Sequence, residues 1–197
     1  MKKASLLALV AFFVIGIQGH AQEMDIAIGF NAVTAPSASS ASGDHAPQTL
    51  SGGLYPSISG NFFFKGRFGV GANLAWRASR NLYFGDIPYR PLFYDINAVW
   101  GPRLGKTATA ELMAGMGAES IRIYGFTNCG FVGCTNYVSS NHFLGHFGAG
   151  LRTNIHGGFF IRPEAHLYLV NNNNDFSSAR VTRFGVSIGY TFAPPVY

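Results

Sequence analysis

The sequence predicts an all-β fold, a closed antiparallel up-and-down barrel of about eight strands. Apolar side chains alternate with small or polar ones along about eight segments, as they do when successive strand side chains point to opposite faces. Short and long connections between these segments also alternate, which is typical of an up-and-down barrel. Charged residues make up only 12% of the chain, against about 25% in ordinary soluble domains, while aromatic residues reach 15%.

The first residues have the pattern of a secretory signal peptide. Lys2 and Lys3 form a charged region, residues 4–17 form an apolar run, and Gly19-His20-Ala21 offers small residues for cleavage before Gln22. The apolar run is shorter than the roughly 20 residues that a membrane-spanning helix needs. We therefore expect cleavage and export rather than a helical anchor.

The domain organisation follows from this cleavage site. We expect a signal peptide over residues 1–21, one barrel domain over residues 22–192, and a short proline-containing tail over residues 193–197. The formal net charge of +5 falls to +3 when Lys2 and Lys3 leave with the signal, and no cluster of lysine and arginine stands out. The sequence therefore predicts no nucleic-acid partner.

The alternating segments can be placed in order along the chain. Their approximate ranges are 24–34, 50–64, 67–77, 91–100, 107–123, 139–155, 159–169 and 179–192. In the third segment, RFGVGANLAWR, every second residue from Phe68 to Trp76 is apolar and the residues between are small. The other segments carry on the corresponding face Ile26, Ile28 and Phe30; Leu54, Ile58, Gly60 and Phe62; Leu92, Tyr94, Ile96, Ala98 and Trp100; Ala108, Ala110, Leu112, Ala114, Met116 and Ala118; Phe143, Phe147, Ala149 and Leu151; Phe159, Ile161, Pro163, Ala165 and Leu167; and Phe184, Val186, Ile188, Tyr190 and Phe192.

The connections differ in length in a regular way. Short turns follow the second, fourth and sixth segments, at residues 65–67, 101–106 and 155–158. Longer polar connections follow the first, third, fifth and seventh segments, at residues 35–49, 78–90, 124–138 and 170–178. A membrane barrel with short periplasmic turns and longer extracellular loops has this asymmetry.

The second face of the strands decides which way the sheet is turned. It carries small residues together with Arg, Glu, Asp and His, and its glycines leave room for long charged side chains in a narrow interior. The opposite orientation would put the bulky apolar residues inside and leave Gly and Ala on the exterior, which is a poor water-facing surface. We therefore expect the bulky apolar face to contact lipid, where a closed barrel satisfies every backbone polar group. A periplasmic lipocalin-like barrel that binds a small apolar ligand inside is the alternative, and it requires the opposite orientation.

Two sets of side chains follow from this orientation. Aromatic residues near strand ends are expected to form interfacial girdles: Phe62, Phe68, Trp76, Trp100, Phe159, Tyr190 and Phe192. The polar interior is expected to contain Arg77, Asp95, Glu111, Glu119, His142, His146, Arg152, Arg162, Glu164, His166 and Arg183. Such charges could form an ion path or a catalytic constellation, but a salt-bridged network that fills the interior is favoured, because buried charges need partners and eight strands leave little room.

Cys129 and Cys134 lie close together in the third long connection, in the sequence NCGFVGC. In an exported protein this spacing predicts a disulfide that closes a small loop. No further ligands lie near them, so we expect no metal and no cofactor.

With these features assembled, the chain resembles the small outer-membrane β-barrels of the OmpA transmembrane-domain and OmpX type. The last strand, RFGVSIGYTF, is similar to the assembly signal of that family, although Ala193-Pro194-Pro195-Val196-Tyr197 follow it here. The resemblance covers nearly all of the mature chain and is one of pattern. It implies an outer-membrane location and a porin-like or OmpA-like scaffold.

Lipid-modifying barrel enzymes are the main rival class. Lipid A deacylases place a catalytic His two residues before a Ser, and none of the six histidines here has Ser at that position. Palmitoyltransferase barrels carry a helix before the first strand, whereas alternation begins here almost at the cleavage site. His142 and His146 share a face with glutamates, so acid–base chemistry is the remaining route to catalysis.

These observations lead to one expectation about function. We expect a non-enzymatic, monomeric outer-membrane barrel with a structural or surface-interaction role. Its partners would be outer-membrane lipid and a surface partner reached through mobile external loops.

Overall fold

A computed structural model of the protein describes residues 23–35, 50–64, 67–83, 86–130, 133–171 and 179–192. The predicted signal peptide (1–21) and tail (193–197) lie outside the described residues and stay predictions. Within the described ranges, no helix has the length and hydropathy needed to cross a bilayer.

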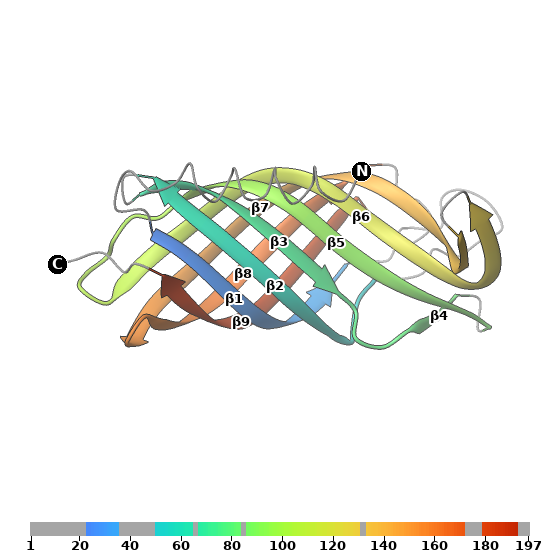
Figure 1. Ribbon diagram of the computed structural model, residues 1–197, viewed down its shortest axis with the longest axis horizontal. Coiled ribbons are helices and arrows are strands. Elements are labelled where there is room, and N and C mark those ends of the chain that lie inside the picture. The colour runs from blue at the N-terminus through green and yellow to red at the C-terminus, as the bar shows by residue number, and fades with distance from the viewer. Residues whose placement is uncertain are drawn as a thin grey trace, which may run out of the picture.

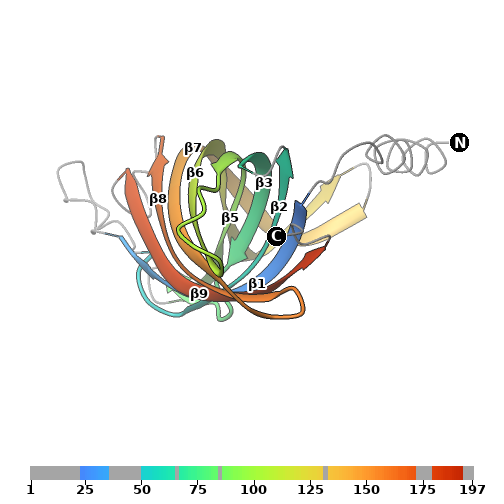
Figure 2. The ribbon, with the colours of Figure 1, turned by 90° about the vertical axis from the view of Figure 1, so that its left-hand side faces the viewer.

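The described ranges form nine strands in a single closed sheet. They are β1 (Glu23–Thr34), β2 (Leu54–Phe64), β3 (Phe68–Trp76), β4 (Asn81–Tyr83), β5 (Ile87–Trp100), β6 (Ala108–Gly130), β7 (Gly133–His156), β8 (Phe159–Val170) and β9 (Arg180–Phe192). All pairings are antiparallel; β1 pairs with β9, and β3 pairs with β5. Eight strands therefore enclose the interior (Figures 1 and 2), and the short β4 lies beside β5 beyond the end of β3. The predicted eight-stranded up-and-down barrel is confirmed.

The two ends of the barrel differ. β1 begins and β9 ends at the same end as the turns that join β2 to β3, β5 to β6 and β7 to β8; we call it the short-turn end (left in Figure 1). In the last of these turns Gly157 and Gly158 have φ values of +59° and +92°, a region that glycine adopts without steric cost. The opposite end, which carries β4 and the tip of the β6–β7 hairpin, is the long-loop end.

The second and third long connections contain more strand than the sequence indicated. Residues 78–90 include β4 and the start of β5, which pair through Asn81 and Tyr89. The expected loop at 124–138 is mostly a continuation of the β6–β7 hairpin, whose ladder resumes after a register shift between Tyr124 and Asn128. Gly125, with φ +101°, lies in this irregularity. An irregularity of this kind breaks the period-two pattern that marks a strand, which is why the strand limits at 123 and 139 were wrong.

Burial alternates along most of the barrel wall, apart from residues 118–124 of β6, and shows which face is outside. Ile188 is 57% exposed and Leu112 is 44% exposed, whereas the charged residues between such positions are buried. The bulky apolar face therefore points away from the barrel axis, as predicted. This orientation contradicts the lipocalin-like alternative, which requires an apolar interior face.

The residues predicted to form aromatic girdles are divided between the two ends. Six of them lie near the short-turn end, and Trp76 lies at the opposite end of β3. At the short-turn end, Phe68 stacks on Trp100 with ring centroids 6.3 Å apart, and Phe159 meets Tyr190 edge to face at 5.0 Å. Rings from β3 and β5, and from β8 and β9, therefore cover the outer wall near this rim.

A charge placed on the middle of the outer wall tests the orientation. We expect Ile188→Arg to lower the free energy of unfolding by about 2–4 kcal/mol, the cost of an arginine at the lipid-facing midplane of a barrel. The measurement is urea unfolding of the protein in lipid vesicles. The matched control is Thr107→Arg, at an exposed position of the β5–β6 turn, which we expect to change stability by less than about 0.5 kcal/mol. Equal effects of both variants would contradict the assignment of the lipid-facing wall.

Candidate functional site

The interior of the barrel is the one place where charged side chains gather in large numbers in the described part of the chain. It has two zones: a mainly polar zone toward the short-turn end, which also contains a small apolar cluster of Phe63, Val99 and Met113, and a larger apolar cluster toward the long-loop end. Both are buried, and their residues come from all eight strands of the barrel wall.

Arg152 on β7 is the first centre of the polar zone. Its guanidinium contacts the carboxylate of Glu23, lies 3.2 Å from Asp25 Oδ2 and lies 3.6 Å from Glu111 Oε1. Glu23 and Asp25 are on β1, while Glu111 is on β6. The salt bridges therefore cross the interior and tie opposite walls of the barrel together.

Arg162 on β8 is the second centre. It donates to Glu111 Oε2 at 2.8 Å and to Glu164 Oε2 at 2.9 Å. It also donates to the hydroxyls of Ser59 at 2.7 Å and Ser187 at 3.2 Å. Glu111 accepts from Arg162 and also lies beside Arg152, so the two arginine centres share one carboxylate.

Small residues opposite the charged ones make this packing possible. Glu164 is paired with Gly150 on β7 and with Gly185 on β9. A Cβ atom at Gly150 would lie 3.1 Å from the Cδ atom of Arg162, closer than ordinary side-chain contacts. The glycines of the inward face thus provide the space that the long side chains occupy.

A histidine pair continues the network toward the apolar cluster. His146 Nε2 lies 2.9 Å from His166 Nδ1, and the two rings are stacked with centroids 5.0 Å apart. His146 Nδ1 lies 3.1 Å from Asp95 Oδ1, and His166 Nε2 lies 3.5 Å from Glu164 Oε1. Asn73 then donates to Asp95 Oδ2 and to the Tyr168 hydroxyl, both at 3.3 Å.

Asp95, His146, His166 and Glu164 thus form a continuous chain of three side-chain contacts. His146 Nδ1 also lies 2.6 Å from Asn97 Oδ1. Both imidazoles are buried within the barrel, so this chain of contacts is part of its packed interior.

The apolar cluster occupies the interior near the long-loop end. Its buried members are Val33, Ala35, Leu50, Tyr55, Tyr89, Phe93, Ile121, Leu144, Tyr168, Val170 and Val181. Phe93 stacks on Tyr168 with centroids 5.1 Å apart, and the Tyr55 hydroxyl donates to the carbonyl of Leu50 at 2.8 Å. The interior is thus not polar throughout, because the inward face becomes apolar toward this end.

Most of the predicted interior residues lie in or beside the polar network. Asp95, Glu111, His146, Arg152, Arg162, Glu164 and His166 are joined by the contacts above. Arg77, Glu119 and Arg183 are also buried inside, with the Arg183 guanidinium 5.5 Å from the Tyr168 ring centroid. His142 is only half-buried; its Nε2 lies 3.0 Å from the hydroxyl of Ser140 on the same strand, away from the other histidines.

Sequence reasoning missed several members of the network. Glu23, Asp25, Asn61, Asn73 and Asn97 are all buried on the inward face. The signal that identifies them is the alternation itself, because each lies between outward apolar or small residues such as Met24 and Ile26. Within the described ranges, no group of His, Cys, Asp and Glu is arranged to hold a metal ion.

The tip of the β6–β7 hairpin is the second feature of functional interest. Cys129 and Cys134 form the predicted disulfide, with Cα atoms 4.0 Å apart, and both residues are exposed. In the described part of the chain, the neighbouring ladders stop at Ile123 on β6 and at Leu144 on β7. The hairpin therefore extends beyond the barrel wall toward the long-loop end (Figure 1).

No protein-family model and no curated protein matches the sequence. Solved structures do match along nearly the whole chain. Ail, the attachment invasion locus protein of Yersinia pestis, solved with the heparin analogue sucrose octasulfate, is 18% identical with a TM-score of 0.57 and covers 87% of this chain and 99% of its own. This chain has the fold of the small outer-membrane β-barrels.

Two further structures support the same fold. Neisserial surface protein A is 7% identical with a TM-score of 0.61, covering 88% of this chain and 98% of its own. The N-terminal barrel of Pseudomonas aeruginosa OprF is 14% identical with a TM-score of 0.53, and the match covers 89% of this chain and 100% of the OprF chain. The resemblance to this barrel type, inferred from strand pattern, is thus confirmed at the level of the fold.

The buried ion pairs should be strongly coupled. We expect Arg162→Met to lower the free energy of unfolding by about 3–5 kcal/mol, because it leaves carboxylates buried without their partner. Glu111→Gln in the same chain should recover part of that loss. Urea unfolding in lipid vesicles measures both variants, with exposed Arg67→Met at the β2–β3 turn as the control. Strictly additive losses would show that Arg162 and Glu111 do not form one unit.

The disulfide should stabilise the hairpin tip and leave the barrel unaffected. We expect Cys129→Ser with Cys134→Ser to raise the rate of proteolysis within residues 125–138, because no other strand of the described ranges pairs with the tip. The temperature at which the folded barrel unfolds on a gel should stay the same. A lowered unfolding temperature would instead mean that the hairpin contributes to the barrel itself.

Proposed function

We propose that this protein spans an outer membrane as a closed, non-enzymatic barrel that presents its long-loop end to the cell exterior in a structural or surface-interaction role. The observation that carries the proposal is the combination of an apolar outer wall with a filled interior. Large apolar side chains such as Ile96 and Phe143 are more than half exposed, which suits contact with acyl chains. Export through a cleaved signal peptide and a monomeric state belong to the same proposal.

The filled interior supports a non-enzymatic role. The side chains able to act as acid or base, among them His146, His166 and Glu164, are buried within the barrel and lie against one another. A substrate would have to displace this network before reaching them. Their geometry suits a rigid support for the wall better than a reaction centre.

The exposed hairpin supports a surface interaction. Residues 124–130 and 133–138 stand beyond the neighbouring ladders, and the Cys129–Cys134 disulfide limits the conformations of their tip. Loops held on a rigid scaffold are a common location for binding residues. The likeness to Ail, whose name refers to attachment and which was solved with a heparin analogue, points the same way.

Reconstitution tests the proposal. We expect the purified chain to enter the membrane fraction, to need detergent for extraction, and to migrate differently on gels before and after heating. In planar bilayers it should give no steady conductance, because the network and the apolar cluster fill the interior and an apolar constriction excludes water. Extraction without detergent would contradict membrane insertion, and a stable open channel would contradict the closed interior.

Analysis of lipid A tests the alternative that the protein is a lipid-modifying enzyme. The acyl pattern of lipid A from cells with and without the protein should be the same. A changed pattern would overturn the non-enzymatic part of the proposal while leaving the membrane location intact.

A further inference from the structure

Three arginines form a row on the outer wall at the long-loop end. Arg90 on β5 is directly opposite Arg122 on β6, and both have the outward orientation of the apolar positions on their strands. Arg80 directly precedes β4, and the pairing of Asn81 with Tyr89 brings Arg80 beside Arg90. None of the three forms a salt bridge with a carboxylate in the part of the chain that the structure describes.

The three guanidinium groups are only partly satisfied by the protein. Arg80 lies over the ring of Tyr124 at 3.9 Å, Arg122 lies 4.9 Å from the ring centroid of Tyr137, and Arg90 donates to a backbone carbonyl at 3.1 Å. The Nε atoms of Arg90 and Arg122 are buried without a hydrogen-bond partner among the described residues. Like charges placed directly opposite in a ladder destabilise a sheet. An anion between these arginines would remove that repulsion.

The depth of the row on the wall is defined by β5. Ten residues separate Arg90 from Trp100, which lies near the short-turn rim. At about 3.3 Å per residue and a strand tilt of about 40°, the two are about 25 Å apart along the barrel axis. This is about the height of the apolar band of an outer-membrane barrel. The arginines therefore lie at headgroup level when Trp100 lies at the opposite interface.

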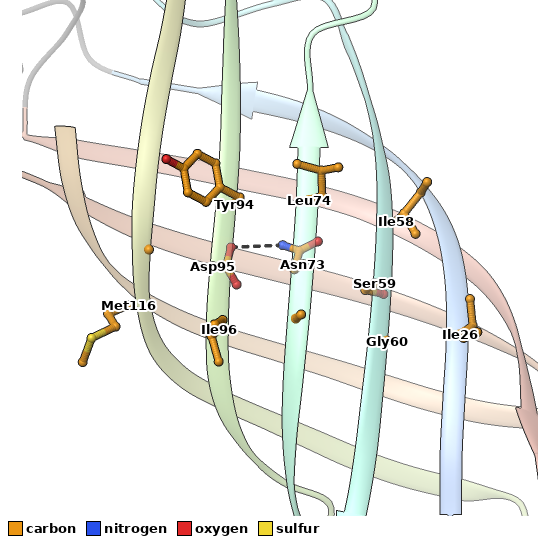
Figure 3. A pocket seen from close by; sticks show the side chains of 12 residues that line it. Ile26, Ile58, Ser59, Gly60, Asn73, Leu74, Tyr94, Asp95, Ile96 and Met116 are labelled. Carbon is orange, nitrogen blue, oxygen red and sulfur yellow. Dashed lines mark hydrogen bonds between the residues drawn. The ribbon is translucent and has the colours of Figure 1, made fainter. Parts of the chain in front are cut away.

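An apolar hollow lies on the outer wall below the row. Small residues such as Gly60 and Ala72 line it. Larger side chains such as Leu74, Tyr94 and Ile96 also line it (Figure 3). It crosses from β1 to β6, and Tyr94 is four residues from Arg90 on the same face of β5. The outer wall thus has an apolar depression that can accommodate an acyl chain, with the three arginines on its long-loop side.

We propose that the row Arg80–Arg90–Arg122 binds the phosphate group of a membrane lipid in the outer leaflet, with an acyl chain of that lipid lying in the hollow beneath. The proposal rests on the membrane location proposed above. Arginine is suited to this task because its planar fork binds phosphate oxygens in pairs. Clusters of basic residues at the membrane surface also attract anionic lipid.

Trp76 provides a direct reporter, because it is paired with Leu92 on β5, two residues from Arg90. The full chain carrying Trp100→Phe is reconstituted in phosphatidylcholine bilayers that contain brominated phosphatidic acid or brominated phosphatidylcholine. We expect Trp76 fluorescence to be quenched preferentially by the phosphatidic acid. The preference should fall roughly fivefold for each arginine replaced by glutamine, in R80Q, R90Q and R122Q separately and together.

Three controls separate the explanations. Arg67→Gln, at the exposed turn of the short-turn end, should leave the preference unchanged. The double variant R90K with R122K keeps both positive charges but loses the paired N–H donors of the guanidinium groups, so it should keep part of the preference for phosphatidic acid. A chain with Trp76→Phe that reports from Trp100 should show no preference.

Each contrary result has a defined meaning. Equal quenching by the two lipids, or a preference that persists in the triple glutamine variant, would overturn the lipid site while leaving membrane insertion intact. Stabilisation of the unsubstituted chain by inorganic phosphate in plain phosphatidylcholine, without any preference for phosphatidic acid, would assign the arginines to a free anion and overturn the lipid proposal. Failure of the unsubstituted chain to insert into any of these bilayers would overturn the proposed function and the lipid site together.

Discussion

In the proposed membrane location, the absence of hydrogen-bonding solvent in hydrocarbon is the constraint on which this structure depends. A strand in that environment must find backbone partners on both sides, so the sheet has to close. Pairing of β3 with β5 and of β1 with β9 completes the ring. Closure with eight strands leaves an interior only wide enough for side chains, and the rest of the architecture follows from that narrowness.

Filling the interior with charges is costly unless each charge has a partner. Glu111 meets that requirement twice, since it lies against both Arg152 and Arg162. The resulting network joins β1, β6, β7 and β8 across the barrel axis, and the apolar cluster fills the remaining interior toward the long-loop end. A barrel filled in this way is a rigid support, which is why the proposed surface interaction is assigned to its outer surface and to the segments beyond its wall.

The sequence was sufficient for local features and insufficient for those that depend on register. Alternation with period two identified the strands, their count and the outward position of Ile188, because each of these follows from neighbouring residues alone. The pairing of Arg162 with Glu111 depends on the register of several strands, and no local pattern contains it. The extended hairpin was missed because the irregularity at Tyr124 interrupts the alternation. The arginine row was missed because Arg80, Arg90 and Arg122 meet only across a ladder.

Under the proposed membrane location, the separation of Trp100 and Arg90 along β5 also sets the thickness of bilayer that the barrel accepts. In a thicker membrane, either the rings would leave their interface or the guanidinium groups would be drawn into hydrocarbon, and each ångström of such mismatch has an energetic cost. Bacterial outer membranes are thinner than average. Hydrophobic matching therefore gives this chain a physical reason to be retained in a thin bilayer, independent of any sorting receptor.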